Sequence, residues 1–302
     1  MSQNESSEKY FSTALVGTLM IFLSAVGFSA KAVIIKLAYQ LDVDPITLLS
    51  LRMAFSLPFF VMMAVYGEMC AKERISGRDA LNLMVLGLIG YYLSSLMDFE
   101  GLQYVSAGLE RLILFLYPTF VVLLSAAFLG RKITKRDAIA LVMSYVGVAL
   151  AVSHDIASRG NNTLFGSLVI FGCAVSWAVY LVGADKMMNR IGAVRFTGYA
   201  MVASTVAVLI HYGATRGEVI LRQSSEVYKL SLVMAILSTV LPVLLLSGGL
   251  RRIGASKTAM ISSVGPVFTI FLAYIFLGEK ISALQLAGTA MIIGGVLSVK
   301  NR

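Results

Sequence analysis

Long apolar runs alternate with short polar segments along the whole chain. A helix needs about 20 apolar residues to cross a bilayer, and most of the runs approach or exceed that length. The longest polar connections, residues 67–79 and 214–229, are too short for a separate soluble domain. The pattern predicts an all-α membrane protein with ten transmembrane helices, at residues 13–38, 45–66, 80–100, 105–129, 137–152, 164–184, 193–213, 230–249, 253–277 and 284–299.

The two halves of the chain are similar to each other. Residues 17–26 align with residues 166–175 at an offset of 149, and residues 118–133 align with residues 266–281 at an offset of 148. Eight of the sixteen positions in the second pair are identical, and they include a proline, a glycine and a lysine. Chance similarity between apolar runs would match leucine more readily than these types. We therefore predict a duplicated five-helix unit.

Five spans per unit is an odd number, so the second unit must enter the membrane upside down relative to the first. The expected organisation is an N-terminal tail (1–12), a first repeat (13–153), a linker (154–162), a second repeat (163–299) and a C-terminal tail (300–302). Two inverted repeats are typical of secondary transporters, which bind their substrate near the bilayer midplane between the repeats and work by alternating access.

Composition excludes a soluble protein. The chain is 58% hydrophobic and 14% charged, with a mean hydropathy of +0.84, whereas a soluble domain carries about 25% charged residues. The net charge of +9 could suggest nucleic acid as a partner. The basic residues stand in loops between apolar runs, however, which is the positive-inside pattern of a membrane protein.

The basic residues also predict an orientation. If the N-terminus is inside, fifteen Lys and Arg residues fall in inner loops and tails, five fall in outer loops, and five fall within spans. We expect a multi-pass protein of the cell (inner) membrane with both termini cytoplasmic. The polar first twelve residues lead into a span with no convincing cleavage site, so we expect no signal peptide.

Several short motifs occur in both halves. The first set is YVSA at 104–107, Pro118, Phe-Leu-Gly at 128–130 and Gly147, and the second is Pro266, Phe-Leu-Gly-Glu ending at Glu279, Gly294 and Gly295. With Lys36, Arg52 and the sequence Ser-Trp-Ala at 176–178, they resemble the EamA family of the drug/metabolite transporter superfamily. The resemblance covers nearly the whole chain and implies a ten-span exporter of metabolites or amino acids.

The two repeats differ at one position of this family pattern. The glutamate that often follows Phe-Leu-Gly is Glu279 in the second repeat, but Arg131 takes its place in the first. We expect both residues to cap a helix end, and the difference argues against a symmetric role.

Charged residues also distinguish the repeats. A charge at the bilayer centre costs ~2.5–3.5 kcal/mol on insertion scales, so charged residues within spans face a cavity or a partner. The second repeat is mostly uncharged at the matching positions, although Asp185 matches Lys36. This asymmetry favours a role in substrate recognition. Seven charges from four spans are predicted to converge in the outer half of the first repeat: Lys31, Lys36, Arg52, Asp98, Glu100, Glu110 and Arg111.

Specific roles follow from these positions. Glu110 and Arg111 are adjacent and cannot share one helix face, so at most one of them points straight into a central cavity. Glu110 is the first candidate for proton coupling and Asp98 the second, because an acid in a low-dielectric cavity can exchange a proton. The predicted substrate-binding residues are Lys31, Glu110, Arg111, Trp177, Tyr180 and Lys257.

Alternatives stay open for several of these residues. We expect Lys36, Arg52 and Glu100 to form structural ion pairs, but Lys36, Asp98 and Glu100 are also close enough to span ends to snorkel. The rings of Trp177 and Tyr180 either line the cavity or pack helices together. Pro118 and Pro266 are either paired hinges or simple bends.

Three functions are compatible with the sequence. The first is a secondary transporter that exports small polar metabolites, amino-acid-like or carboxylate-bearing. The second is an importer or exchanger of a vitamin, a nucleotide-like or a phosphorylated solute. The third, a membrane scaffold or enzyme, lacks any nucleotide-binding, metal-binding or nucleophile motif, so we expect no enzyme, cofactor or metal. Cys70 and Cys173 suggest no disulfide. The expected partners are a small-molecule substrate and the lipid bilayer, and the chain is a monomer or a homodimer.

Overall fold

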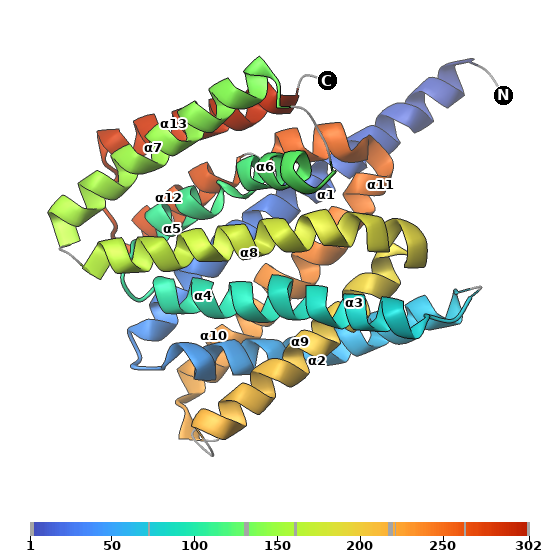
Figure 1. Ribbon diagram of the computed structural model, residues 1–302, viewed down its shortest axis with the longest axis horizontal. Helices are drawn as coiled ribbons and strands as arrows, with labels where there is room; N and C mark the ends of the chain where they lie inside the picture. The colour runs from blue at the N-terminus through green and yellow to red at the C-terminus, as the bar shows by residue number, and fades with distance from the viewer. Residues whose placement is uncertain are drawn as a thin grey trace.

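A computed structural model describes residues 3–71, 73–129, 133–159, 162–216, 220, 222–262 and 264–300. Within these ranges, the side chains of residues 3–13, 129, 136–137, 140, 154, 157–159, 247, 250–251, 254–260 and 296–300 lie outside the described part. All regular elements of the described part are helical (Figure 1). The fold is therefore all-α, as the apolar pattern predicted.

The helices follow one another with short connections. Two of them contain π-helical turns, here called η1 and η3, which continue directly into the next α-helix. The elements in chain order are α1 (Gln3–Tyr39), α2 (Pro45–Met69), α3 (Gly77–Gly87), η1 (Leu88–Leu93), α4 (Ser94–Gly101), α5 (Ala107–Leu114), α6 (Tyr117–Leu129), α7 (Lys135–Arg159), α8 (Asn162–Ile191), α9 (Ala193–Thr215), α10 (Ser225–Ala235), η3 (Ile236–Val240), α11 (Leu241–Ser262), α12 (Gly265–Leu277) and α13 (Ala283–Lys300).

Local sequence explains several helix ends. A short polar residue stands before a helix, and its side chain accepts a hydrogen bond from a backbone N–H of the first turn. The α12 helix ends at Gly278, whose φ of 64° lies in the left-handed region that glycine adopts without strain. The N-capping residues are Asp44 for α2, Ser76 for α3, Ser106 for α5 and Ser224 for α10.

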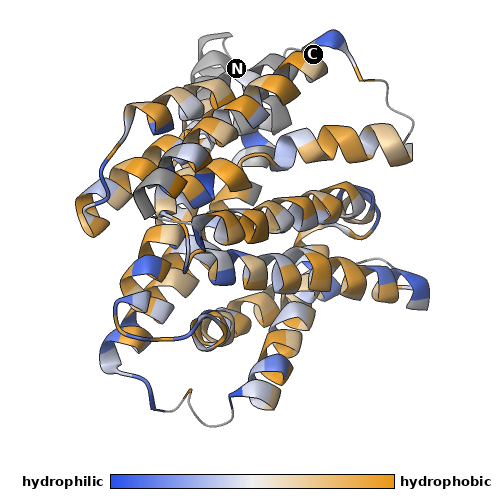
Figure 2. Ribbon diagram, turned by 60° about the vertical axis from the view of Figure 1, so that its left-hand side comes forward, coloured by the Kyte–Doolittle hydropathy of each residue, from blue (hydrophilic) through white to orange (hydrophobic). Residues whose placement is uncertain are grey.

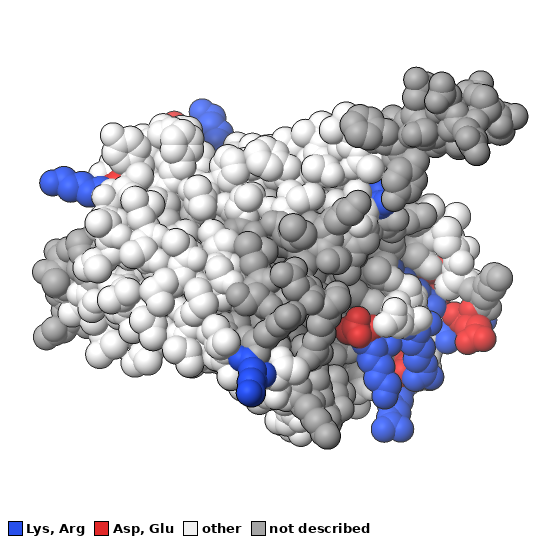
Figure 3. Space-filling view, turned by 90° about the horizontal axis from the view of Figure 1, so that it is seen from above, with Lys and Arg blue, Asp and Glu red and all other residues white. Residues whose placement is uncertain are grey.

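The outer surface of the bundle is apolar. Leu19, Met62 and Ile210 are 55%, 58% and 67% exposed, which water would disfavour and lipid tails would not. Hydrophobic residues cover most helices, and hydrophilic ones gather near helix ends and loops (Figure 2). Figure 3 shows a broad uncharged surface with many of its Lys, Arg, Asp and Glu side chains clustered at the right-hand end. The chain is a multi-pass membrane protein.

The segments predicted as ten spans contain helices of two lengths, long enough to cross a bilayer or shorter than that. Seven helices in the described residues are long and apolar enough to cross a bilayer. The segments expected as spans five, nine and ten contain shorter apolar helices, Leu141–Ser153, Gly265–Leu277 and Ala283–Gly295. A helix of 13 residues such as α12 is about 20 Å long, short of the ~30 Å hydrocarbon core. Helix length thus supports seven spans directly, and the count of ten stays a prediction.

The order of elements recurs along the chain. The caps Ser76 and Ser224, the π-helical starts Leu88 and Ile236, and the starts of α6 and α12 are each separated by 148 residues. The starts of α7 and α13 have the same separation. This is the offset of the sequence repeat, so related sequences form related elements in the two halves.

Contacts between the halves are reciprocal. Helix α1 packs along α11 and α12, while α8, its counterpart by offset, packs along α4 and α6. The pairs α2 with α9, α7 with α13, and α5 with α12 also join one half to the other. Each half therefore contributes to one shared interior, and the two halves do not form separate bodies (Figure 1).

The spans that contain Pro118 and Pro266 are interrupted. Helix α5 ends at Leu114 and α6 begins at Tyr117, while α11 ends at Ser262 and α12 begins at Gly265. Each proline thus lies in the first turn of a new helix, where its missing N–H costs no hydrogen bond. Each proline also lies near the middle of its predicted span, 105–129 or 253–277, and the helix is broken just before it.

Two ends of the bundle need names. The Tyr39 end holds Tyr39, the loop of residues 40–44 and the turn after Gly101, and lies on the left of Figure 1. The Met69 end holds Met69 and the loop of residues 70–76, and lies on the right.

Candidate functional site

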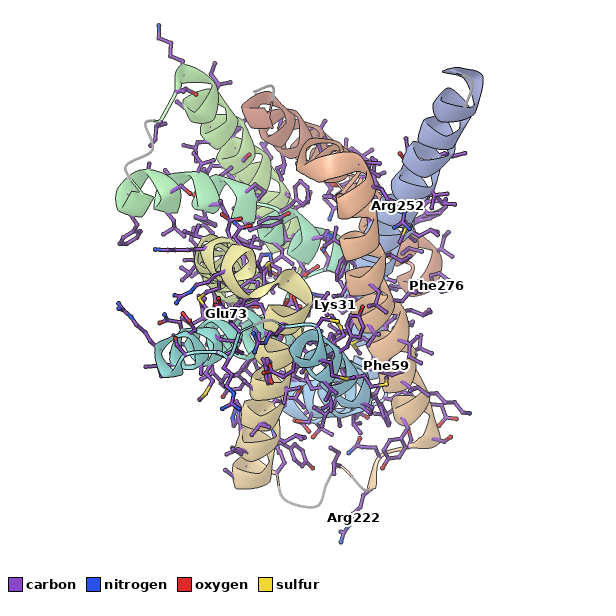
Figure 4. All side chains as sticks on the ribbon, turned by 90° about the vertical axis from the view of Figure 1, so that its right-hand side faces the viewer. Lys31, Phe59, Glu73, Arg222, Arg252 and Phe276 are labelled. Atoms are coloured by element: carbon purple, nitrogen blue, oxygen red, sulfur yellow. The ribbon has the colours of Figure 1, made fainter. Side chains whose placement is uncertain are left out.

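A lysine and two carboxylates meet inside the bundle. Lys31 of α1 places its Nζ 2.5 Å from Asp98 Oδ2 of α4 and 3.8 Å from Glu110 Oε1 of α5. Their side chains are 16%, 2% and 0% exposed, in the order Lys31, Asp98, Glu110. Figure 4 shows Lys31 near the middle of the molecule, surrounded by helices. We call these three residues the Lys31 cluster.

Charge is incompletely matched within the Lys31 cluster. One ammonium faces two carboxyl groups, and the carboxyl groups of Asp98 and Glu110 also interact electrostatically with each other. Apart from Lys31 and this mutual contact, no described donor reaches the oxygens of the two acids. Buried carboxylates without donors are costly, so the arrangement is suited to taking up a further proton or a cationic group.

Arg52 of α2 extends the cluster. Its Nη2 donates to Ser95 Oγ at 3.1 Å, and its guanidinium carbon lies 5.1 Å from the centre of the Phe99 ring. Arg52 is 6% exposed and also interacts electrostatically with Asp98. Arg52 thus interacts with the acid Asp98 without a direct ion pair in the described residues. Its guanidinium is held in place by the Ser95 hydroxyl and the face of the Phe99 ring.

Glu110 and Arg111 point to different neighbours, as their adjacency requires. Glu110 faces Lys31, whereas Arg111 reaches the start of α12 in the other half. A Cβ atom on Gly265 would lie 2.8 Å from Arg111 Nη2, so the guanidinium would have to shift to make room for any side chain there. No described residue accepts a hydrogen bond from the buried Nε of Arg111. Arg111 is therefore a cation at the interface between the halves with unused hydrogen-bonding capacity.

An aromatic cluster lies further along α8. Trp177 stacks on Tyr180 at 4.9 Å between ring centres, and both contact Tyr91 edge-on at 5.6 and 5.0 Å. The Tyr180 hydroxyl donates to that of Tyr91 at 2.9 Å. Its ring fills the space at Gly90, where a Cβ would lie 2.2 Å from a ring carbon. Tyr180 is 1% exposed and packs α8 on η1, while Trp177 stays partly exposed.

The α8 helix connects this aromatic cluster to the Lys31 cluster. Cys173 lies one turn before Trp177, is buried, and interacts electrostatically with Lys31 and Glu110. It is a free thiol, as is the exposed Cys70. One face of α8 thus carries a buried thiol beside the charges.

A cavity opens at the Tyr39 end. Its volume is about 620 Å³, and its lining includes Lys36, Tyr39, Gln103 and Glu279. Lys36 stands five residues after Lys31 on α1, which is about 7.5 Å along a helix axis. The cavity therefore lies one to two turns above the Lys31 cluster. Glu100, predicted to form a structural ion pair, accepts a hydrogen bond from Gln103 Nε2 at 2.7 Å at the same end.

Asp155 and Gln285, which the sequence did not single out, help to hold the start of α5 through Ser106. Ser106 Oγ accepts from the Leu109 N–H at 3.1 Å and donates to Asp155 Oδ2 at 2.7 Å. Asp155 Oδ1 accepts from Gln285 Nε2 of α13 at 3.1 Å. These partners are 49 and 130 residues apart in the chain, so no local pattern could reveal them.

Glu279 was expected to cap a helix end, and it does so across the two halves. Its Oε1 accepts from the Ala107 N–H at 3.1 Å, and its Oε2 lies 3.5 Å from the Gly108 nitrogen that donates to it. Arg131, its counterpart, lies outside the described residues, as does the side chain of the predicted site residue Lys257.

Ion pairs join the halves at the Met69 end. Arg195 of α9 forms a two-fold hydrogen bond with the Glu68 carboxylate, both distances being 2.7 Å, and donates to the Glu73 carbonyl at 3.0 Å. Arg190 of α8 contacts Asp79 of α3 at 2.9 Å. Ser76 caps α3 by accepting from the Asp79 N–H, and its hydroxyl donates to Asp79 Oδ2. This is a local contact, but the ionic partner of Asp79 is 111 residues away.

Close backbone contact accompanies these ion pairs. A Cβ on Gly67 would lie 2.7 Å from the Arg195 Cα, and a Cβ on Gly198 would lie 2.5 Å from the Ala64 nitrogen. Helices α2 and α9 therefore touch backbone to backbone beside the Glu68–Arg195 pair. The Met69 end is closed between these two helices.

Comparison with known proteins adds four findings. The model of the EamA-like transporter family matches residues 15–153 and again residues 164–300. The uncharacterized transporter YcbK of Bacillus subtilis is 31% identical over 95% of this chain and 92% of its own. A probable terminal-alkyne amino-acid exporter of Streptantibioticus cattleyicolor is 27% identical over 80% of each chain. One crystal structure shares the fold, with a TM-score of 0.65 and 18% identity over 94% of this chain and 96% of the other.

Proposed function

The chain belongs to the EamA-like transporter family, and from this premise we propose that it is a secondary transporter that exports small polar metabolites by alternating access. The observation that carries the proposal is the Lys31 cluster, a lysine between two buried carboxylates in the interior that both halves enclose. Ionisable residues placed inside a membrane protein are costly and mark substrate or ion pathways.

Alternating access is supported by the relation between the halves. We propose ten spans as two inverted repeats of five, since an odd number of spans inverts the second copy. Reciprocal packing of α1 on α11 and of α8 on α4 is what a two-fold axis between the repeats would produce. A site on such an axis can be exposed to either side by rocking one repeat against the other. Pro118 and Pro266, each after a helix break, are the proposed hinges.

The two ends of the bundle differ in a way that fits one conformation of this cycle. The Tyr39 end has the cavity above the Lys31 cluster, and the Met69 end has the Glu68–Arg195 pair between touching helices. With both termini cytoplasmic in the inner membrane, as the basic loops favour, the Tyr39 end faces out. The protein then stands open outward and closed inward.

The arrangement of charges suits a substrate with an amino and a carboxylate group. In this proposal the ammonium of the substrate binds Asp98 and Glu110, and its carboxylate binds Arg111. Trp177 contributes an apolar wall. The name of the 27% identical exporter, which refers to an amino acid, supports the same substrate class.

Proton coupling follows from the same carboxylates. Glu110, with Asp98 second, is proposed to bind a proton when the substrate ammonium is absent, because two buried acids that share one lysine tolerate only one negative charge well. Inward movement of the proton would then drive outward movement of the substrate.

The alternative is an importer or exchanger of an anionic solute, such as a phosphorylated one. Arg111 favours it, because its buried Nε has no described acceptor. An anion would bind Arg111 and leave the Lys31 cluster as a structural charge group.

Metabolite profiling tests the main proposal and identifies the substrate. Culture media from overexpressing and deletion strains are compared, together with strains that express Lys31→Ala or Glu110→Gln. We expect one amino-acid-like solute to be enriched in the medium by the wild type, and both variants to lose that enrichment at equal protein level in the membrane. Lys229→Ala is the control, because its 4.0 Å pair with Glu226 is exposed. Enrichment unchanged in both cluster variants would refute the site.

A further inference from the structure

The short helix α5 is held at its start by carboxylates from other elements. It has eight residues and carries both Glu110 and Arg111. Asp155 of α7 holds its cap Ser106, and Glu279 binds the Ala107 and Gly108 N–H groups. We infer that Glu279 is a positioning residue: by binding the start of α5, it sets where the second half of the chain places the Glu110 and Arg111 side chains of the first half.

Electrostatics favours a carboxylate, and not a cation, at the start of α5. The start of a helix carries a partial positive charge, and a carboxylate there is stabilised both by the exposed N–H groups and by the dipole. Arg131, the counterpart of Glu279 in the first repeat, has the opposite charge and accepts no hydrogen bond. A carboxylate at this position therefore holds α5, the helix that carries the charged site, whereas the matching segment of the second half lies within α11 and begins no helix.

Freedom of movement distinguishes Glu279 from Asp155. Asp155 is 3% exposed and its partner Gln285 is 6% exposed, so this contact is fixed within the bundle. Glu279 is only half-buried and lines the cavity of about 620 Å³ at the Tyr39 end. It follows the left-handed residue Gly278 in the connection between α12 and α13, and water and solutes reach it.

The break after α5 gives this contact its effect. Helix α5 ends at Leu114, and the chain turns before α6 begins at Tyr117. An eight-residue helix between a turn and a break can tilt as a unit, and α5 packs on α12, the element that Glu279 follows. Movement of the second half at the Tyr39 end is thereby passed through Glu279 to the Lys31 cluster. The inference rests on the proposed function only where it takes this movement to be a step of the transport cycle.

Thiol reactivity measures the position of α5 without any substrate. Cys173 interacts electrostatically with Glu110, and Cys70 is removed as Cys70→Ser so that a single thiol remains. In purified protein we expect Glu279→Gln to change the rate of Cys173 alkylation by N-ethylmaleimide at least threefold, and Glu279→Asp to recover part of the wild-type rate. Glu226→Gln, an exposed acid in the first turn of α10, is the matched control and should leave the rate unchanged.

Transport kinetics provide the second measurement. Loss of one charge-assisted hydrogen bond to α5 should raise the apparent KM about tenfold, because Glu110 and Arg111 are then held less well in the positions that bind substrate. The maximal rate should stay nearly unchanged, because both side chains are still present. An unchanged Cys173 rate together with an unchanged KM would overturn the inference. So would a loss of thermal stability with both values unchanged. If no solute is transported even by the wild type, the proposed function fails, and the alkylation rates alone decide whether Glu279 positions α5.

Discussion

At the scale of single residues, the interior depends on small side chains as much as on charged ones. The Tyr180 ring occupies the place of a side chain on Gly90, and Arg111 occupies the place of one on Gly265. The tyrosine and the arginine were both recognisable as unusual in an apolar span. The glycines opposite them were not, because their role depends on which helices meet.

Gly90→Ala tests the packing of Tyr180. A Cβ at this position would lie 2.2 Å from the ring, so the ring or α8 must move. Overpacking of this kind costs about 1–3 kcal/mol, and we expect a lower melting temperature in detergent. Gly213→Ala is the control in a helix, since nothing lies within 4 Å of its Cβ position. Equal melting temperatures for the two variants would show that Tyr180 repacks without strain.

At the scale of helices, the Met69 end is held by α2 and α9 and the Tyr39 end contains the cavity. Hydrophobic runs predicted both helices and their approximate ends. They could not predict that Glu68 of α2 meets Arg195 of α9, because the two residues are 127 apart in the chain. Long-range ion pairs of this kind depend on helix packing, which one sequence does not specify.

Glu68→Arg should open the Met69 end. The substitution places two cations together where the two-fold hydrogen bond was, and it should favour the conformation in which α2 and α9 separate. In a Cys70→Ser background, a membrane-impermeant maleimide should then label Cys173 faster from the Met69 side. The double variant Glu68→Arg with Arg195→Glu restores opposite charges and should return the rate to that of the wild type. Equal labelling in the single and double variants would exclude the pair as a gate.

The helix breaks before Pro118 and Pro266 show another limit of sequence patterns. The prolines indicated a hinge or a bend in each span, but apolar residues continue across each break, so the runs did not show where one helix ends and the next begins. A proline at the first turn of a helix and a proline in its middle have similar sequence surroundings. Their difference lies in whether the preceding residues stay helical, which neighbouring helices decide.

Pro118→Ala tests the hinge. Alanine restores an N–H and favours a continuous helix from α5 to α6. We expect slower transport with an unchanged or higher melting temperature, because a straightened helix is stable but moves less easily. Pro58→Ala, in the middle of α2 and partly facing outward, is the control. Transport equal to the wild type in Pro118→Ala would indicate a simple bend.

At the scale of the whole molecule, duplication was the most informative sequence feature. The sequence predicted a duplicated unit, and in the structure helix caps, π-helical turns and the starts of α6 and α12 recur at the same offset of 148, because repeated sequence repeats its local structure. The membrane class followed from composition. Composition does not fix the number of spans, since α12 and the apolar part of α7 are shorter than the thickness of a bilayer. The position of such short helices in the protein is decided by their packing against neighbouring helices and not by their length.

The convergence of Lys31, Asp98 and Glu110 was predicted from topology alone. Spans that alternate in direction bring residues at matching depth together, and these three met as expected. Arg111 and Glu100 were grouped with them by depth but found other neighbours, because depth gives no information on the direction of a side chain around the helix.

Transport by purified protein in liposomes tests the central claim most directly. The solute identified by profiling is loaded, and its release is measured with and without a pH gradient for the wild type, Lys31→Ala, Glu110→Gln and the control Glu226→Gln. We expect gradient-driven release for the wild type and the control, and release no faster than from protein-free liposomes for the two cluster variants. Release at the wild-type rate by both Lys31→Ala and Glu110→Gln would contradict the claim that the Lys31 cluster is the transport site.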